Sequence, residues 1–327
     1  MAGGAWLWRG RLGRVMVIST KPDTSRLPTG SLSLSEQYLE VPGYELPGSQ
    51  DEHVTSRPNY NMSLTVSVVI PTLNEARNLP HVFARLPDGL HEVIVVDGNS
   101  VDDTVAIARR LRPDVRIVIQ NRSGKGNALA CGFAVATGDV IAMVDADGSA
   151  DPAEIPRFIQ ALLDGADFAK GSRFTFGGGS SDITRLRHLG NRMLSGLVNV
   201  LCGTKYSDLC YGYNVFWRRH VSVFGLPAET DVPIGGRLWG DGFEVETLIN
   251  IRIAQAGLKV KEVASYEYSR IHGVSNLRAP SDGWRVLRTI FAERYYHWRR
   301  TAKSDTCIPV SPAALAEAAP ESISRTP

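Results

Sequence analysis

The stretch that decides the fold runs from residue 64 to residue 104 and reads LTVSVVIPTLNEARNLPHVFARLPDGLHEVIVVDGNSVDDT. It contains two continuous apolar runs rich in β-branched residues, VSVVI at 66–70 and EVIVV at 92–96, and residues 76–86 between them can form a helix. Buried strands of a parallel sheet read as continuous apolar runs of this kind. The stretch therefore predicts a βαβ unit.

The same alternation continues toward the C-terminus. Helices are expected at residues 103–111 and 127–136, and strands at 115–119 and 140–144 (VIAMV). Continuous apolar strands that alternate with helices need cover on both faces of their sheet. We therefore expect an α/β fold with a Rossmann-like, mostly parallel sheet and helices on both faces.

Length and composition limit the function classes. The chain has 327 residues, with 43% hydrophobic and 21% charged residues, which is ordinary for a globular protein. Its 36 Lys and Arg residues nearly balance 34 Asp and Glu residues, for a formal net charge of +2. We expect no nucleic-acid partner, because such proteins usually carry a strongly basic surface.

Four regions are expected along the chain. Residues 1–63 are rich in Pro, Ser, Thr and Gly without a sustained apolar period, so they predict a poorly ordered N-terminal extension. Residues 64–278 contain the alternating pattern and predict the folded domain. Residues 279–303 predict an amphipathic helix, and the Pro- and Ala-rich residues 304–327 predict a disordered tail.

Cysteine usage and hydropathy indicate the compartment. The four cysteines are scattered, without a Cys-x-x-Cys pair, which argues against a disulfide scaffold and against structural zinc. No apolar run approaches the roughly 18 residues that a spanning helix needs. We therefore expect a cytoplasmic protein, with at most a peripheral contact at the inner face of the membrane.

Acidic residues follow three of the four expected strands. The first strand is followed by PTLNE at 71–75, the second by Asp97, and the fourth by Asp145 and Asp147. Ligands of such sheets bind beyond the carboxyl ends of the strands, so these residues are the candidate site. Asp and Ser after a strand also cap the next helix, and that interpretation stays open for Ser100, Asp102 and Asp103.

Asp145 and Asp147 predict a metal site. Two carboxylates one residue apart at a strand end repel each other unless a cation or hydrogen-bond donors lie between them. An oxygen-ligated cation such as Mg²⁺ or Mn²⁺ fits this pair, and such ions usually also hold substrate phosphates.

Four segments, in this order and spacing, resemble the family 2 glycosyltransferases with a GT-A fold, and most of all the polyprenyl (dolichyl) phosphate sugar synthases. They are VSVVIPTLNEARNL, EVIVVDGNSVDDT, RSGKGNALACGFAVATGD and VIAMVDADG, and the resemblance covers roughly residues 64–278. It implies an inverting enzyme that moves a hexose from a UDP- or GDP-sugar to a polyprenyl phosphate, with Mg²⁺ or Mn²⁺ as cofactor.

The resemblance also implies donor-binding residues. Pro71, Leu73 and Glu75 match the first loop of the nucleoside pocket, and Asp97 matches the aspartate that contacts the base or ribose. A carboxylate can accept hydrogen bonds from a ring N–H or from ribose hydroxyls.

The Asp-x-Asp segment of Asp145, Ala146 and Asp147 matches the motif that binds the metal and, through it, the donor diphosphate. Ser149 stands where the lipid-phosphate enzymes often have Gln.

Two basic residues are matched to the donor side as well. Lys125 lies in RSGKG at 122–126, which lacks the spacing of a P-loop and which the family places beside the nucleotide; an ordinary loop-to-helix turn is the alternative. Arg173 lies in a Gly-Ser-Arg segment, whose Arg sits near the donor phosphates in the family.

Residues on the acceptor side are implied by two later segments. WGDGFEVE at 239–246 matches the acceptor segment, with Asp241 as candidate general base and Glu244 as an acceptor contact. Glu244 and Glu246 also suit the dipole of a helix that starts there. SRIHGVSN at 269–276 matches a segment whose Arg270 is a candidate catalytic residue and, with Ser275, an acceptor contact. Asn276 stands where a Lys is common, which weakens the case for a lipid phosphate.

The expected C-terminal helix carries an aromatic stripe. Trp284, Leu287, Phe291, Tyr295 and Trp298 share one helical face, and Arg residues flank it. A basic amphipathic helix with aromatics can lie in a membrane interface. The alternative is that the same stripe packs on the folded domain.

Other functions stay open at the level of sequence. The same donor chemistry could serve a soluble or polysaccharide hydroxyl acceptor, for which a general base is needed. A sugar nucleotidyltransferase also presents carboxylates at strand ends, but it releases pyrophosphate. A non-catalytic nucleotide-binding module would tolerate the loss of Asp147 and Asp241.

Overall fold

The computed structural model describes residues 7–9, 15–17, 64–229, 238–273 and 279–304. In the N-terminal unit, strands β1 (Leu7–Arg9) and β2 (Val15–Val17) pair antiparallel. The predictions of a poorly ordered extension at 1–63 and a disordered tail at 304–327 otherwise fall outside the described residues. All other described elements belong to the second compact unit.

A seven-stranded sheet forms the centre of this unit, in the order β10-β7-β9-β6-β3-β4-β5. All neighbouring pairs are parallel except those made by β9, which runs antiparallel to β6 and β7. The predicted α/β fold with a mostly parallel sheet is confirmed. The strands are β3 (Val66–Thr72), β4 (Glu92–Asp97), β5 (Arg116–Ile119), β6 (Val140–Met143), β7 (Phe168–Ser172), β9 (Asn214–Trp217) and β10 (Val260–Ala264).

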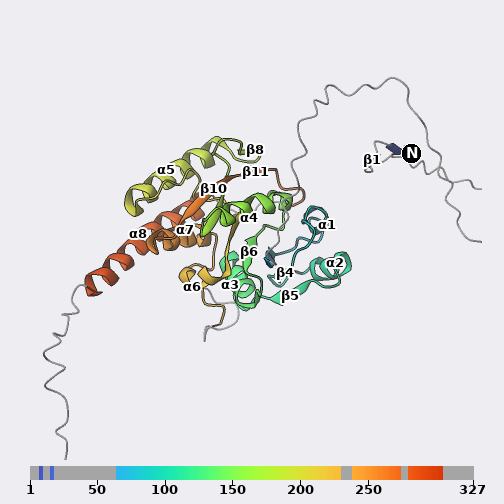
Figure 1. Cartoon of the computed structure of the whole chain (residues 1–327), viewed down its shortest axis with the longest axis horizontal. Helices are drawn as coiled ribbons and strands as arrows, with labels where there is room; N and C mark the ends of the chain where they lie inside the picture. Colours follow the sequence, from blue (N-terminus) through green and yellow to red (C-terminus); the bar gives the residue numbers. More distant parts are fainter. Residues whose placement is uncertain (1–6, 10–14, 18–63, 230–237, 274–278, 305–327) are drawn as a thin grey trace, which may run out of the picture. The chain divides into compact units, whose positions relative to one another are not determined.

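Helices cover both faces of the sheet (Figure 1). Along β3 the side chains alternate: Val66, Val68 and Ile70 join one apolar cluster, and Val69 joins the cluster on the other face. Alternation of this kind follows from the period of two in a strand. The helices are α1 (Leu79–Phe83), α2 (Thr104–Leu111), α3 (Lys125–Val135), α4 (Ile155–Leu163), α5 (Arg185–Cys202), α6 (Val221–Phe224), α7 (Val245–Gln255) and α8 (Ala279–Ser304), with 3₁₀ turns at Pro152–Glu154 and Arg218–His220.

The helices α5, α7 and α8 share a third apolar cluster. Val198 of α5, Ile251 of α7, and Val286 and Ile290 of α8 are buried in it. The expected helix at 279–303 is therefore present as α8, and its inner face packs on the folded domain. No helix of the described segments is long and apolar enough to cross a bilayer.

Three elements differ from the sequence-based expectations by two residues or more. β3 continues through Pro71 to Thr72, and these two residues are in register with Val96 and Asp97 of β4. The helix expected at 76–86 is shorter: α1 begins at Leu79, and the preceding residues form a turn in which the carbonyl of Glu75 accepts from the N–H groups of residues 78 and 79. The helix expected from residue 127 begins earlier, at Lys125.

Two short strands link distant loops. β8 (Gly179–Ser180) pairs in parallel with β11 (Tyr266–Glu267). The pairing ties the chain that follows β7 to the chain that precedes α8.

Candidate active site

The loops after β3 and β4 interlock at the carboxyl edge of the sheet. The N–H of Asn74 donates to the Ser100 hydroxyl, the N–H of Val101 donates to the Asn74 side chain, and the N–H of Glu75 donates to the Thr104 hydroxyl. Asn74 adopts a left-handed backbone with φ of 58°, a conformation that Asn tolerates better than most residues. These bonds give the first loop a fixed shape, with Leu73 exposed beside it.

Asp97 is buried at the end of β4 with one oxygen satisfied. Its Oδ2 accepts from the N–H of Ser100 at 2.9 Å, whereas its Oδ1 is buried without a hydrogen-bond partner in the described residues. A buried carboxylate oxygen normally has a donor, and its absence calls for an explanation. A bound ligand with an N–H or hydroxyl group would supply one.

Asp145 follows β6 and forms an ion pair with Lys125 at the start of α3. The Lys125 ammonium lies 2.7 Å from Asp145 Oδ1 and also 2.7 Å from Glu246 Oε1 in α7. Burial alone would lower the pKa of Lys125, but the negative charges of Asp145 and Glu246 outweigh it and raise the pKa. Burial raises the pKa of Glu246, against the opposing effect of Lys125. The cation is therefore shared by two carboxylates from different elements.

Asp147 faces Arg270, which comes from the segment before α8. An Arg270 guanidinium nitrogen lies 3.4 Å from Asp147 Oδ2, and another lies 2.9 Å from Glu75 Oε1. Burial raises the pKa of Glu75, although hydrogen bonds from Asn78 and Arg270 act in the opposite direction. The N–H of Ile271 donates to the carbonyl of Asp147 at 3.2 Å, so the two segments run side by side.

Asp145 and Asp147 fit a divalent cation by chemistry and by access. Both carboxylates are partly exposed, with side-chain exposures of 35% and 20%. Within the described residues, no group of three or more His, Cys, Asp or Glu side chains is arranged around a metal position. Further oxygen ligands would come from water and substrate, which is how proteins usually bind Mg²⁺.

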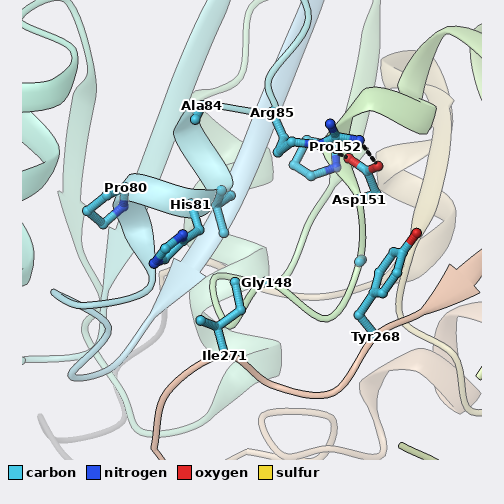
Figure 2. A pocket seen from close by; sticks show the side chains of 11 residues that line it. Pro80, His81, Ala84, Arg85, Gly148, Asp151, Pro152, Tyr268 and Ile271 are labelled. Carbon is cyan, nitrogen blue, oxygen red and sulfur yellow. Dashed lines mark hydrogen bonds and ion pairs between the residues drawn. The ribbon is translucent and has the colours of Figure 1, made fainter. Parts of the chain in front are cut away.

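A cavity of about 480 Å³ adjoins this site (Figure 2). It lies between α1 and the segments around Gly148 and Ile271, and the ion pair of Arg85 with Asp151 borders it. Gly148 has φ of 77°, and a Cβ there would lie 2.5 Å from the Ile271 side chain. The positive φ favours glycine at this position, and any larger residue would also require the Ile271 side chain to move.

Asp241 lies in a buried ion pair with Arg122. Its two oxygens accept from the guanidinium at 2.9 and 3.1 Å, and Arg122 also donates to the carbonyl of Pro227 at 2.7 Å. The backbone carbonyl of Asp241 accepts from the N–H of Gly126 at 2.9 Å. A Cβ at Gly126 would lie only 1.7 Å from the carbonyl oxygen of Gly240. The Arg122–Asp241 pair thus fixes the loop that carries Lys125.

The remaining predicted acceptor-side residues are Glu244 and Ser275. Glu244 is buried, and its Oε1 lies 3.3 Å from the N–H groups of Gly240 and Gly242, while its Oε2 has no hydrogen-bond partner in the described part of the chain. Glu246, two residues later in the chain, forms an ion pair with Lys125 instead. Ser275 and Asn276 lie outside the described residues.

Arg173 lies at the end of β7 in a cluster of two carboxylates. Its guanidinium donates to Asp208 at 2.7 and 2.9 Å and to Glu267 at 3.0 and 3.1 Å. The side chain is only 4% exposed. Burial would lower the pKa of Arg173, but Asp208 and Glu267 raise it. In this state the guanidinium holds three segments together and is closed to solvent.

The structure brings several predicted residues to one edge, and it adds residues that the sequence analysis missed. Glu75, Asp97, Lys125, Asp145, Asp147 and Arg270 gather around the carboxyl ends of β3, β4 and β6, with Ala146 buried between the two aspartates and Pro71 inside β3. Arg122, Asp208 and Glu267 were not predicted. The acidic residues carried no local signal, because their partner is known only once the chain is folded, whereas Arg122 stood inside the quoted glycine-rich segment.

Comparisons with known proteins find similarity to glycosyltransferases. The model of a family described as glycosyl transferase family 2 matches residues 67–224. An uncharacterized glycosyltransferase of Mycobacterium tuberculosis is 42% identical over 108 residues, which cover 33% of this chain. The chain spans about half of that relative, 48% of its length.

A longer alignment reaches a relative with a named activity. Polyprenol monophosphomannose synthase of Mycolicibacterium smegmatis is 32% identical over 201 residues, which cover 58% of this chain and 74% of that protein. Among solved structures, glucosyl-3-phosphoglycerate synthase from Mycobacterium tuberculosis, in complex with Mn²⁺, uridine diphosphate and glucosyl-3-phosphoglycerate, superposes with a TM-score of 0.53. It is 24% identical, and the match covers 70% of this chain and 80% of that one, so it shows a shared fold.

Proposed function

The chain belongs to glycosyltransferase family 2, and on this premise we propose that it transfers a hexose from a nucleoside diphosphate sugar to a polyprenyl phosphate with inversion at the anomeric carbon. The bond from that carbon to the donor diphosphate would break, and a bond to an oxygen of the acceptor phosphate would form. The observation that carries the proposal is the pair Asp145 and Asp147, each facing a cation from another segment.

The donor would bind across the carboxyl ends of β3, β4 and β6. Asp97 would accept a hydrogen bond from the base or the ribose at its unsatisfied Oδ1, beside the loop of Pro71, Leu73 and Glu75. Lys125 would face the diphosphate. We likewise propose that the donor nucleotide is UDP or GDP and that the transferred sugar is a hexose.

Asp145 and Asp147 would hold Mg²⁺ or Mn²⁺. When bound, the ion supplies Lewis-acid stabilisation of the leaving diphosphate. Lys125 and Arg270 form ion pairs with the two carboxylates. In the proposed complex they would receive phosphate oxygens of the donor. A guanidinium suits phosphate through paired hydrogen bonds, so Arg270 is the residue we assign to the phosphates of donor and acceptor.

A polyprenyl phosphate is already ionised near neutral pH and needs no strong general base. We therefore assign Asp241 a positioning role: with Arg122 it holds the loop of Lys125 in place. Arg173 would likewise position the chain after β7 through Asp208 and Glu267. Glu244, with one buried oxygen unsatisfied, and Ser275 stay proposed acceptor contacts.

A ligand screen tests the donor half of the proposal. Thermal unfolding should be followed with UDP-, GDP- and dTDP-sugars, each with and without Mn²⁺. A ligand that binds the native state at 100 times its Kd stabilises it by about 2.7 kcal/mol. One nucleotide class should raise the Tm only when Mn²⁺ is present. An equal rise in EDTA would remove the metal from the proposal.

A further inference from the structure

We propose that the exposed faces of the adjoining helices α5 and α8 dock on an anionic lipid bilayer. The two helices pack against each other through their inner faces, and Figure 1 shows them on the side of the domain away from α1 and α2. This docking goes beyond the proposed function, because it needs neither donor nor acceptor.

The outer faces of both helices are apolar to an unusual degree. Large side chains on them are exposed by half or more, and Val200 and Trp284 reach 83% and 69%. Such a concentration of exposed apolar side chains marks an interaction surface. The residues are Leu186, Leu189, Met193 and Val200 of α5, and Trp284, Phe291, Tyr295, Tyr296 and Trp298 of α8; we call them the α5–α8 surface.

The inner face of α8 buries Val286 and Ile290 as in an ordinary surface helix, but its outer face is unusual. Its aromatic stripe faces outward, which contradicts the alternative that the stripe packs on the domain. Both acidic residues of its described part face inward: Asp282 is 7% exposed and pairs with Arg285, and Glu293 is 5% exposed and pairs with Arg252. The helix therefore presents aromatics where polar residues are expected.

The charges that remain at the surface are of one sign. α5 contains no acidic residue, and the acidic residues of α8 between 281 and 299 are the two buried ones. The exposed charged side chains in the described parts of these helices are all arginines, among them Arg185, Arg192, Arg288, Arg294 and Arg299.

Aromatics with cations fit an anionic bilayer. Trp and Tyr favour the interface, and each nearby Arg adds attraction to anionic headgroups. A second copy of the chain fits less well, because two cationic faces would repel each other.

The α5–α8 surface is connected directly to the candidate site. α5 follows the chain after Arg173, and α8 follows the segment of Arg270. The chain before α5 and the chain before α8 are held together by the pairing of β8 with β11. A hydrogen bond from the N–H of Ser269 to the Ser181 hydroxyl, at 3.1 Å, joins them as well. Docking would thus bring the site to the interface, where a lipid acceptor is found; this last step rests on the proposed function.

Vesicle co-sedimentation tests the docking. The full chain is mixed with vesicles of phosphatidylcholine alone or with added phosphatidylglycerol, without polyprenyl phosphate or nucleotide sugar. We expect binding to the anionic vesicles, weak binding to the neutral ones, and loss of binding at high salt.

Paired variants locate the binding. Trp284→Ser with Phe291→Ser, and separately Arg192→Glu with Arg299→Glu, should each weaken binding about tenfold or more. Leu163→Ser is the matched control, because Leu163 is a 45% exposed apolar residue on α4. It should bind like the unchanged protein, and all variants should keep the same circular dichroism spectrum.

The outcomes are separable from those of the proposed function. No binding to either vesicle type, or equal binding by all variants, overturns the docking. A concentration-dependent dimer that the Trp284 and Phe291 substitutions abolish would make this face an interface between copies and also overturns it. Transfer to a short, water-soluble polyprenyl phosphate is measured apart from vesicles, so vesicle binding without transfer would leave the docking standing and remove the function.

Discussion

Charge balance at single residues explains how the acidic edge of the sheet is stable. Lys125 comes from the start of α3 and Arg270 from the segment before α8, and each neutralises one carboxylate of the Asp-x-Asp pair. Without them, Asp145 and Asp147 would repel each other at a partly buried strand end. The two cations that neutralise this edge are also the residues to which we assign phosphate binding in the proposed function.

Asp147→Asn should lower kcat by about 100-fold or more, because one charged ligand of the ion that stabilises the leaving group is lost. The fold should be unchanged, since the carboxylate is partly exposed and an amide is isosteric. Initial rates across a Mn²⁺ titration measure the effect. Asp164→Asn, which breaks a surface pair with Lys261, is the control and should keep the full rate. Full activity of Asp147→Asn, or of the unchanged protein in EDTA, contradicts the metal assignment.

Asp97→Asn should weaken donor binding, because the amide replaces a buried acceptor oxygen that has no partner of its own. Loss of one hydrogen bond to a charged group costs about 1.5–3 kcal/mol, or about 10- to 150-fold in Kd. Calorimetry with the nucleotide and Mn²⁺, in the absence of acceptor, measures it. Asp114→Asn, on an exposed pair with Arg112, should bind normally. An unchanged affinity of Asp97→Asn would take the residue out of the site.

At the scale of the elements, buried ion pairs join segments of the site that are far apart in the sequence. The Arg122–Asp241 pair joins the start of α3 to the chain before α7, and the Arg173 cluster joins β7, the chain before β9 and β11. Both pairs are nearly closed to solvent, so each charge depends on its partner.

Asp241→Asn should destabilise the protein by about 3–5 kcal/mol, because it removes the carboxylate that forms a buried ion pair with Arg122. Urea unfolding gives this value. In a positioning role, the substitution lowers the rate but leaves the shape of the pH–rate profile unchanged. Disappearance of the acidic limb of that profile, with normal stability, would instead make Asp241 the general base and favour a hydroxyl acceptor.

The Arg173 cluster should make stability depend on pH below neutrality. Burial would raise the pKa of Asp208, but hydrogen bonds and charge from Arg173 lower it in the native state. The unfolded chain therefore takes up a proton first, so the contribution of Asp208 is complete above about pH 5 and is lost as the pH falls through the lowered pKa. In thermal unfolding, the Asp208→Asn variant should have a lower Tm than the unchanged protein at pH 7. Its Tm should also fall less as the pH is lowered. Parallel curves for both proteins would contradict this.

The elements divide into those that the sequence predicts and those that it does not. The apolar runs of β3, β4 and β6 are continuous, so their place in a parallel sheet, and the edge where Asp97, Asp145 and Asp147 gather, follow from local pattern. The role of Asp241 does not, because its partner Arg122 is 119 residues away. Arg173 likewise meets Glu267 across 94 residues. Long-range ion pairs leave no local period to read.

The same contrast applies to α8. Its aromatic stripe was visible in the sequence, but the stripe alone could not show whether it faces the core. Burial of Asp282 and Glu293 against arginines settles the orientation, since both acidic residues are on the inner face.

At the scale of the whole molecule, the site and the α5–α8 surface lie in one compact unit. The carboxylates lie at the carboxyl edge of the sheet. The β8–β11 pairing joins the chain before α5 to the chain before α8. The cavity is bordered by Gly148, the residue after Asp147. This arrangement suits a reaction between a water-soluble sugar nucleotide and a lipid phosphate.

The most direct measurement is the product analysis of one reaction. The protein is mixed with the nucleotide sugar that it binds, Mn²⁺ and a short polyprenyl phosphate, and the products are identified by mass and by the anomeric configuration of the sugar. We predict nucleoside diphosphate and a hexosyl phosphoryl polyprenol of inverted configuration, in equal amounts. Release of pyrophosphate, or transfer to a hydroxyl acceptor with none to the polyprenyl phosphate, would contradict the account.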